Sequence, residues 1–433
     1  MATSAELKQN ILNGGYDQAF AKLYGADTAT VAAQRVRYVD MIDHFEENFG
    51  TGRTVCLYSA PGRTEIGGNH TDHNNGVVIA AAVNLDIIAV VAKNDENVVR
   101  VISHGFGKID DVNLRDLTPQ PVEAEHSASL IRGVAAGIVK DGGKVGGFDC
   151  YTTSDVLGGS GLSSSAAFEV CMGAIFRGEY NDNDMKRFDQ VKNAMISQYA
   201  ENVFFGKPCG LMDQMGSSVG GAVAIDFADP SAPLVKKVEY DFTRSGHALC
   251  IVDTGSSHGD LTDDYADITR EMGAVAAHFN KRFLREVPEA DFRAAIPSLR
   301  VRCGDRAVLR AIHYYEDDRR AVQEGEALER GDFARFLELV NASGLSSAVH
   351  LQNTWSISDP SQQAIPLALA AGQELLEGTG AIRVHGGGFA GTIQAFVPND
   401  RLEAFRSGME ALLGRGKCHI LHIRPQGGTV VIG

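Results

Sequence analysis

Hydrophobic positions recur in two different patterns along this 433-residue chain. A helical stripe of apolar residues runs from Val36 to Phe49 and ends at Gly50. Runs rich in Val, Ile and Ala predict buried strands instead. In the first half these strands are expected at 55–59, 77–91, 98–102 and 147–153, with helices at 127–140, 168–180 and from a cap at 181–184 to Phe205.

The second half of the chain begins with strands, continues with helices and ends with both in alternation. Strands are predicted at 222–227 and 248–253, and mostly helical sequence follows from 262 to 378. The tail is expected to form strands at 381–384, 391–397 and 419–423 and a helix at 401–413. This mixture is compatible with an α/β (α+β) fold, and the length suggests two or three domains.

Composition narrows the class of protein. No run of roughly 18 apolar residues occurs, and the first eight residues lack the pattern of a signal peptide, so neither a membrane nor secretion is indicated. A net charge of −15 without long basic blocks argues against a nucleic-acid partner. The seven cysteines are odd in number and widely spaced, which fits a reducing, cytoplasmic location.

A glycine- and serine-rich stretch at 156–167 lies between a predicted strand and a predicted helix. Its glycines allow close backbone approach to a ligand, and the first free N–H groups of the helix favour a phosphate. Ser163, Ser164 and Ser165 add hydroxyls that can cap the helix, bind phosphate or ligate Mg²⁺. Taken alone, the stretch could equally be an ordinary turn with a serine cap.

Two further loops carry unusual chemistry. The segment 60–76 combines glycines, asparagines, His70 and His73, and Pro61 is expected to exclude regular structure at its start. A third glycine-rich loop spans 386–391. No loop matches a Walker motif or carries the dinucleotide fingerprint in the right place.

Together these stretches resemble the three motifs of the GHMP small-molecule kinases, and among them most closely those of the galactokinases. Ala60–Gly76 is similar to the sugar-binding motif, Gly161–Ala166 to the phosphate loop, and Gly386–Gly391 to the third motif. Cys209–Gln214 is similar to a segment particular to galactokinases. The resemblance implies two α/β domains, 1–215 and 216–433, with the active site in the cleft between them. It also implies transfer of a phosphoryl group from ATP, with Mg²⁺, to the anomeric hydroxyl of a small sugar.

Particular residues follow from the resemblance. Asp213 would act as, or assist, the base, with Arg63 between it and the γ-phosphate; this agrees with the need of phosphoryl transfer for fixed positive charge. Ser165 and Glu201 would hold Mg²⁺. The sugar would contact Asn69, His70, Asp72, Gly210 and Tyr265, and ATP would contact Gly159, Ser160, Gly161, Leu162, Ser163, Ser164 and Ser165.

The chain departs from the family pattern at several positions. Asn69 replaces the Glu that contacts the C6 hydroxyl of the sugar, and an amide there removes a carboxylate that would repel an acidic sugar. Galactose is therefore the favoured substrate, with galacturonate or another galactose-configured sugar as the alternative. His73, Leu157 and Ala390 are further departures, and Ala390 would be strained if its position required a positive φ.

Three other classes of function agree less well with the sequence than the kinase does. A metal cluster at His70, Asp72 and His73 would place three ligands within four loop residues, which strains a tetrahedral site. A catalytically silent sugar sensor is disfavoured because Arg63, Asp213, Ser165 and Glu201 are all retained. A nicotinamide oxidoreductase lacks an acidic residue at the required spacing after a glycine fingerprint.

Overall fold

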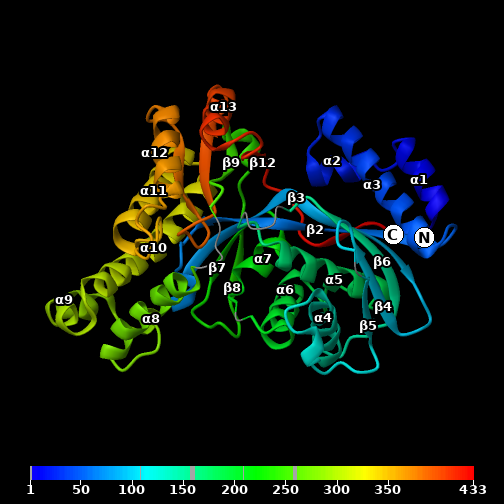
Figure 1. Cartoon of the computed structure of the whole chain (residues 1–433), viewed down its shortest axis with the longest axis horizontal. Coiled ribbons are helices and arrows are strands. Elements are labelled where there is room, and N and C mark those ends of the chain that lie inside the picture. The colour runs from blue at the N-terminus through cyan, green and yellow to red at the C-terminus, as the bar shows by residue number, and fades with distance from the viewer. Residues whose placement is uncertain (1, 108, 157–160, 208, 257–260) are drawn as a thin grey trace.

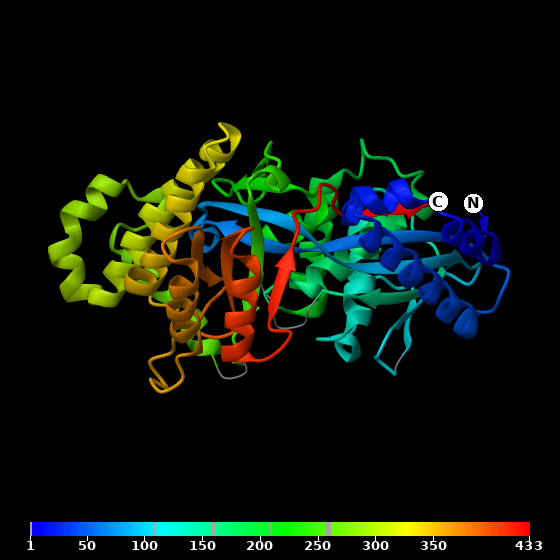
Figure 2. The same ribbon diagram turned by 90° about the horizontal axis from the view of Figure 1, so that it is seen from above.

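The computed structural model describes residues 2–107, 109–156, 161–207, 209–256 and 261–433. Within these ranges the chain forms two β-sheets, and helices pack against both of them (Figure 1). The two termini lie at the same end of the molecule (Figures 1 and 2). No helix among the described residues is long and apolar enough to cross a bilayer. The mixed α/β class expected from the sequence is confirmed.

The first sheet has nine strands among the described residues, in the order β1-β2-β3-β6-β4-β5, with β13 beside β2 and the β7–β8 pair beside β3. All pairings are antiparallel except that of β4 with β6. The strands are β1 (Ala2–Thr3), β2 (Thr54–Gly67), β3 (Val77–Lys93), β4 (Val98–Ser103), β5 (Ile109–Asn113), β6 (Phe148–Ser154), β7 (Ala222–Asp226), β8 (Leu234–Val238) and β13 (Thr429–Ile432).

Helices cover both faces of this sheet, which explains why β3 is an almost continuous apolar run. Ile88 and Val90 pack against the N-terminal helices, whereas Ala89 and Val91 belong to the core beneath α5. One face carries α1 (Ser4–Leu12), α2 (Asp17–Tyr24) and α3 (Thr28–Phe49), and the other carries α4 (Ser127–Lys140), α5 (Ser164–Tyr180), α6 (Gln190–Tyr199), the π-helix η3 (Ala200–Phe205) and α7 (Met212–Val219) (Figure 1).

The second sheet has the order β10-β11-β9-β12 and is antiparallel throughout. Its strands are β9 (His247–Asp253), β10 (Ala381–His385), β11 (Thr392–Pro398) and β12 (Cys418–Leu421). The helices that follow are α8 (Thr262–His278), α9 (Glu289–Cys303), α10 (Asp305–Glu329), α11 (Phe333–Ser346), the π-helix η6 (Ser347–Leu351), α12 (Ala364–Leu376) and α13 (Leu402–Leu413). Short 3₁₀ helices are η1 (Asp72–Asn74), η2 (Pro121–Glu123), η4 (Phe242–Arg244) and η5 (Leu284–Glu286).

The two sheets meet at the end of β2, which lies against β11. The third glycine loop connects the end of β10 to the start of β11. Gln394 of β11 donates hydrogen bonds to the Thr64 hydroxyl over 2.8 Å and to the Glu65 carbonyl over 2.9 Å. Both residues of β2 are buried, so these bonds fix one sheet against the other. The division of the chain into domains at residue 215 stays a prediction.

Several element boundaries differ from those expected. Pro61 lies inside β2, because the pairing of β2 with β3 shifts register between Pro61 and Arg63, and such a bulge tolerates proline. The helix expected to begin at 181–184 begins at Gln190, since Asp182 and Asn183 have positive φ and end helical structure. Strand β8 was not predicted because it is largely exposed and lacks an apolar alternation.

Candidate active site

The guanidinium of Arg63 connects two of the predicted motifs. Nε and Nη2 donate to Oδ1 of Asp213 over 2.8 and 2.7 Å, and Nη1 donates to the Gly161 carbonyl in the phosphate loop. The Arg63 backbone N–H also donates to the Leu162 carbonyl over 3.0 Å. Arg63 is only 6% exposed, so its planar fork is held in one orientation. A single buried cation thus joins β2, α7 and the loop before α5.

Asp213, in the first turn of α7, is held as a carboxylate. Its burial raises the pKa, but the charge of Arg63 and hydrogen bonds from Ser163 and Arg63 outweigh this effect, so the pKa lies below its ordinary value. Oδ2 accepts the hydrogen bond from the Ser163 hydroxyl. About a third of the side chain (34%) remains exposed, so the carboxylate is both ionised and accessible.

The described part of the phosphate loop turns tightly and leads into a helix, as its glycines and serines predict. Gly161 and Ser163 adopt positive φ values of 72° and 55°, and α5 begins at the exposed Ser164. Leu162 is fully buried and anchors the loop in the core beneath β2. A long helix thus starts with free N–H groups beside Arg63, a combination suited to an anion. Gly159 and Ser160, also expected to bind ATP, and Leu157 lie outside the described residues.

Ser165 and Glu201 are brought together from α5 and η3. The Ser165 hydroxyl lies 3.5 Å from Oε1 of Glu201, at the limit of a hydrogen bond, and the exposed Lys207 amine lies 3.6 Å from the same oxygen. Glu201 is only 3% exposed. A hydroxyl and a carboxylate are hard oxygen donors of the kind Mg²⁺ takes alongside phosphate oxygens, so these residues fit the predicted metal.

His70 is held in an unusual conformation with its ring against the third glycine loop. Its φ is 60°, and Nε2 lies 2.8 Å from the Gly387 carbonyl. Because a carbonyl only accepts hydrogen bonds, Nε2 carries the proton and Nδ1 is an acceptor. Burial lowers the pKa of His70 to about 3, so the ring is neutral at physiological pH. No hydrogen bond to Nδ1 is found within the described parts of the chain.

Tyr265 lies beside the same loop, and Gly210 lies beside Asp72 in the sugar motif. A Cβ on Gly210 would lie only 2.7 Å from Oδ2 of Asp72, so the two segments approach as closely as glycine permits. Oδ1 of Asp72 accepts from the His73 N–H over 3.0 Å. The Tyr265 hydroxyl donates to the Gly388 carbonyl over 2.8 Å. Five of the predicted sugar-binding positions therefore lie on or beside two loops, and their contacts with a sugar stay predictions.

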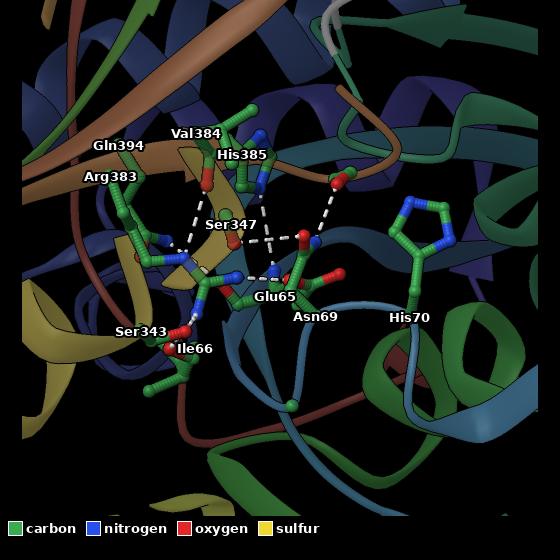
Figure 3. Close-up of polar contacts among 12 residues, drawn as sticks. Glu65, Ile66, Asn69, His70, Ser343, Ser347, Arg383, Val384, His385 and Gln394 are labelled. Carbon is green, nitrogen blue, oxygen red and sulfur yellow. Dashed lines mark hydrogen bonds and ion pairs between the residues drawn. The ribbon is translucent and has the colours of Figure 1, made fainter. Parts of the chain in front are cut away.

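Asn69 lies under these loops and is fully buried (Figure 3). Its amide nitrogen donates to Oε1 of Glu65 over 2.9 Å and to the Gly386 carbonyl over 2.7 Å. Its amide oxygen accepts from the Ser347 hydroxyl over 3.2 Å and from the Asn353 amide over 2.9 Å. Both amide hydrogens and both lone pairs are thus used by protein groups.

A buried carboxylate nevertheless stands next to Asn69. Glu65, four residues earlier on β2, forms an ion pair with Arg383 of β10 (Figure 3). The Arg383 guanidinium is fully buried and also donates to the carbonyls of Ile66 and Val384, over 3.2 and 3.1 Å. Burial raises the pKa of Glu65, against the opposing effect of the Arg383 charge. This pair escaped sequence analysis because its members are more than 300 positions apart.

Three further findings bear on the expectations from the sequence. Ala390 does not have a positive φ; Phe389 does, at 58°, so the strain considered for Ala390 falls on its neighbour. The described residues hold no group of three or more His, Cys, Asp or Glu side chains placed to bind a metal ion. Gln214 ends the galactokinase-like segment 209–214, and it lies against Glu201 in the buried interior together with Glu169, which the sequence did not single out.

Comparisons with known proteins support the motifs. Residues 43–93 match a galactokinase galactose-binding signature, and residues 129–221 match the GHMP kinase N-terminal domain. The fold is similar to that of Lactococcus lactis galactokinase, solved with galactose, with a TM-score of 0.76 at 21% identity over 91% of this chain and 99% of that one.

Other kinases share the fold at lower similarity. Methanococcus jannaschii mevalonate kinase matches with a TM-score of 0.60 at 12% identity, over 86% of this chain and 98% of its own. Streptococcus pneumoniae phosphomevalonate kinase matches with a TM-score of 0.58 at 12% identity, over 86% and 99%.

The two matched segments contain the sugar motif, the phosphate loop, Glu201 and Asp213, which the structure gathers around Arg63. GHMP kinases use ATP as the phosphoryl donor. The chain is a phosphotransferase with the fold of the GHMP kinases, and it carries their N-terminal domain together with the galactokinase galactose-binding signature.

Proposed function

We propose that this protein phosphorylates galactose at its anomeric hydroxyl, using ATP and Mg²⁺, and releases galactose 1-phosphate and ADP. The galactose-binding signature at 43–93 supports the sugar, and the GHMP kinase domain supports the reaction. The observation that carries the proposal is the fork of Arg63 between the Asp213 carboxylate and the phosphate loop at Gly161.

Arg63 is suited to the transferred phosphoryl group. Negative charge spreads over the equatorial oxygens of that group in the transition state, so catalysis depends on positioning and on fixed positive charge. The guanidinium is buried and needs no reorganisation when this charge develops. It would therefore contact the phosphoryl group as it passes between ATP and the sugar.

Asp213 would orient the anomeric hydroxyl and take its proton. Its lowered pKa keeps the carboxylate ionised at neutral pH, and its partial exposure leaves room for a substrate hydroxyl. The hydrogen bond from Ser163 limits rotation of the carboxylate. The oxygen of the sugar would then attack the γ-phosphate, and the bond from that phosphorus to ADP would break.

Ser165 and Glu201 would hold Mg²⁺ together with phosphate oxygens of ATP. When bound, the ion would neutralise charge on the phosphates. Their separation of 3.5 Å and the burial of Glu201 support this assignment.

The chemistry of the sugar loop favours a neutral sugar. Nδ1 of His70 and the Asp72 carboxylate are both hydrogen-bond acceptors, so they suit hydroxyl groups, which donate. The galacturonate alternative rested on the absence of a repelling carboxylate at position 69. The Glu65 carboxyl group lies next to that position, and the Asn69 amide is committed to it and to the Gly386 carbonyl. We therefore assign Asn69 to shaping the loop, and galactose remains the substrate proposed.

The silent sugar sensor would require no turnover, and the arrangement of Arg63, Asp213, Ser165 and Glu201 argues against it.

The proposed function is tested by ³¹P NMR of a reaction with galactose and Mg·ATP. We expect equal formation of ADP and of a sugar phosphate whose signal couples to the anomeric proton. The Asp213→Asn variant should form neither at a comparable rate. ATP consumption without a sugar phosphate, or none at all, would refute the proposal.

A further inference from the structure

The side chain of Gln214 connects the carboxyl groups of two buried glutamates, Glu169 and Glu201, behind the candidate site. Its amide nitrogen donates to Oε2 of Glu201 over 2.7 Å and to Oε2 of Glu169 over 3.2 Å. Gln214 and Glu169 are fully buried, and Glu201 nearly so. Burial and the charge of Glu201 raise the pKa of Glu169 well above its ordinary value, so Glu169 could also donate a hydrogen bond. The amide orientation is therefore set by the shorter bond to Glu201, whose carboxylate oxygen accepts from the Gln214 nitrogen.

This orientation of the amide leaves buried oxygen atoms without hydrogen-bond partners. Among the described residues, Oε1 of Gln214 and Oε1 of Glu169 are buried without a hydrogen-bond partner. An unpartnered buried acceptor is unfavourable, so a glutamine that served only packing would be expected to satisfy its oxygen. Instead the amide nitrogen faces the two carboxyl groups and the Cys209 sulfur, which lies 3.7 Å away, and the amide oxygen has no partner among the described residues.

Two sets of contacts connect Asp213 with Glu201, one through α5 and one through α7. Ser163 donates to Asp213, and Ser165, two residues later, approaches Glu201. On the opposite side, Gln214 follows Asp213 directly on α7 and also binds Glu201. The proton-accepting group and the metal-binding group are therefore linked by one turn of α7 and by the start of α5.

We propose that Gln214 is a positioning residue that holds the Glu201 carboxylate for the divalent cation. By occupying Oε2, it leaves Oε1 directed toward Ser165, which is the oxygen available to a metal ion. Because Gln214 is adjacent to Asp213, it also fixes the spacing between the cation and the base. The inference rests on the proposed function, which assigns Ser165 and Glu201 as the metal ligands.

The test is Mn²⁺ binding to the full chain in the presence of ADP and without sugar, followed by electron paramagnetic resonance. The Gln214→Met variant keeps the volume of the side chain and removes both donors. We expect its Kd for Mn²⁺ to rise about tenfold or more, since a hydrogen bond to a charged group contributes roughly this factor. ADP binding in EDTA should be unchanged.

Gln198→Met is the matched control. Gln198 also lies near Cys209, donating to its carbonyl over 3.1 Å, and it has no contact with Glu201 among the described residues. Its Mn²⁺ affinity should equal that of the wild type. Gln214→Asn, whose amide is one methylene too short to reach both carboxylates, should weaken binding in the same direction and serves if the Met variant does not fold.

A Kd for Mn²⁺ within twofold of the wild type in both Gln214 variants would overturn the proposal. Equal weakening by the Gln198 control would do so as well, because it would indicate a general packing effect. Neither measurement involves a sugar, so failure of the galactose assignment would be seen separately, in the turnover assay.

Discussion

The amide of Asn69 donates a hydrogen bond to the carboxylate of Glu65 over 2.9 Å, and both side chains are buried. The carboxylate missing at position 69 thus has a counterpart four residues earlier, paired with Arg383. This relationship changes what a substitution at Asn69 is expected to do.

Asn69→Glu should destabilise the protein instead of sharpening its choice of sugar. The new carboxylate would face Glu65, and two such charges about 4 Å apart repel by roughly 4 kcal/mol at an effective dielectric constant of 20. We expect the free energy of unfolding in urea to fall by about 2–4 kcal/mol. Asn48→Glu, on the exposed face of α3, should change it by less than about 0.5 kcal/mol. An Asn69→Glu protein as stable as the wild type would contradict this account of the loop.

Arg63→Lys should reduce kcat by about a hundredfold or more, because a single ammonium cannot keep the contacts with both Asp213 and Gly161. The KM for galactose should change little, since the guanidinium held by these contacts would act on the phosphoryl group in the transition state. Steady-state ADP release measures both constants. Arg53→Lys, at an ion pair with Asp149 elsewhere on the sheet, is the control and should retain kcat. A selective rise in KM would move Arg63 from catalysis to binding.

Gly210→Ala should impair sugar binding. The added Cβ would lie 2.7 Å from Oδ2 of Asp72 and push that carboxylate from its position. We expect the KM for galactose to rise about tenfold, the loss of one hydrogen bond to a charged group, with the KM for ATP unchanged. Gly273→Ala, in α8 with open space around the site of a Cβ, should leave both constants unaltered. Unchanged KM for galactose in Gly210→Ala would remove Asp72 from the sugar site.

His70 should make stability depend on pH. Its pKa is about 3 in the folded state and about 6.5 when unfolded, so only the unfolded state binds this proton between those values. The contribution of neutral His70 to the free energy of unfolding is therefore fully present above pH 6.5 and is lost as the pH falls toward 3. Between pH 7 and pH 5 the wild type should lose about 2 kcal/mol more than His70→Asn, whose side chain tolerates the positive φ. Parallel urea titrations at the two pH values test this, and equal losses would contradict it.

The sequence predicted most of the elements and the local character of the site. Long apolar runs such as β3, and the glycine loop before α5, are visible because their signals are local. Pro61 misled the prediction, because its place in a strand depends on a bulge set by the partner strand. The exposed β8 gave no alternation to detect.

The polar contacts behind the site could not be predicted in the same way. The pairing of Glu65 with Arg383 requires two sheets to be docked, and the contact of Gln214 with Glu201 requires α7 and η3 to be packed together. A sequence shows the types of these residues without their neighbours. Their burial, which makes each contact consequential, also appears only after folding.

The most direct test of the central claim is kcat/KM for Mg·ATP-dependent ADP release with galactose, glucose, galacturonate, N-acetylgalactosamine and arabinose, against a control without sugar. We predict that galactose exceeds every other sugar by at least about tenfold, a difference of about 1.4 kcal/mol in transition-state stabilisation. A higher value for galacturonate would show that acceptors such as Asp72 do not govern the choice of sugar, and no sugar-dependent release at all would contradict the kinase itself.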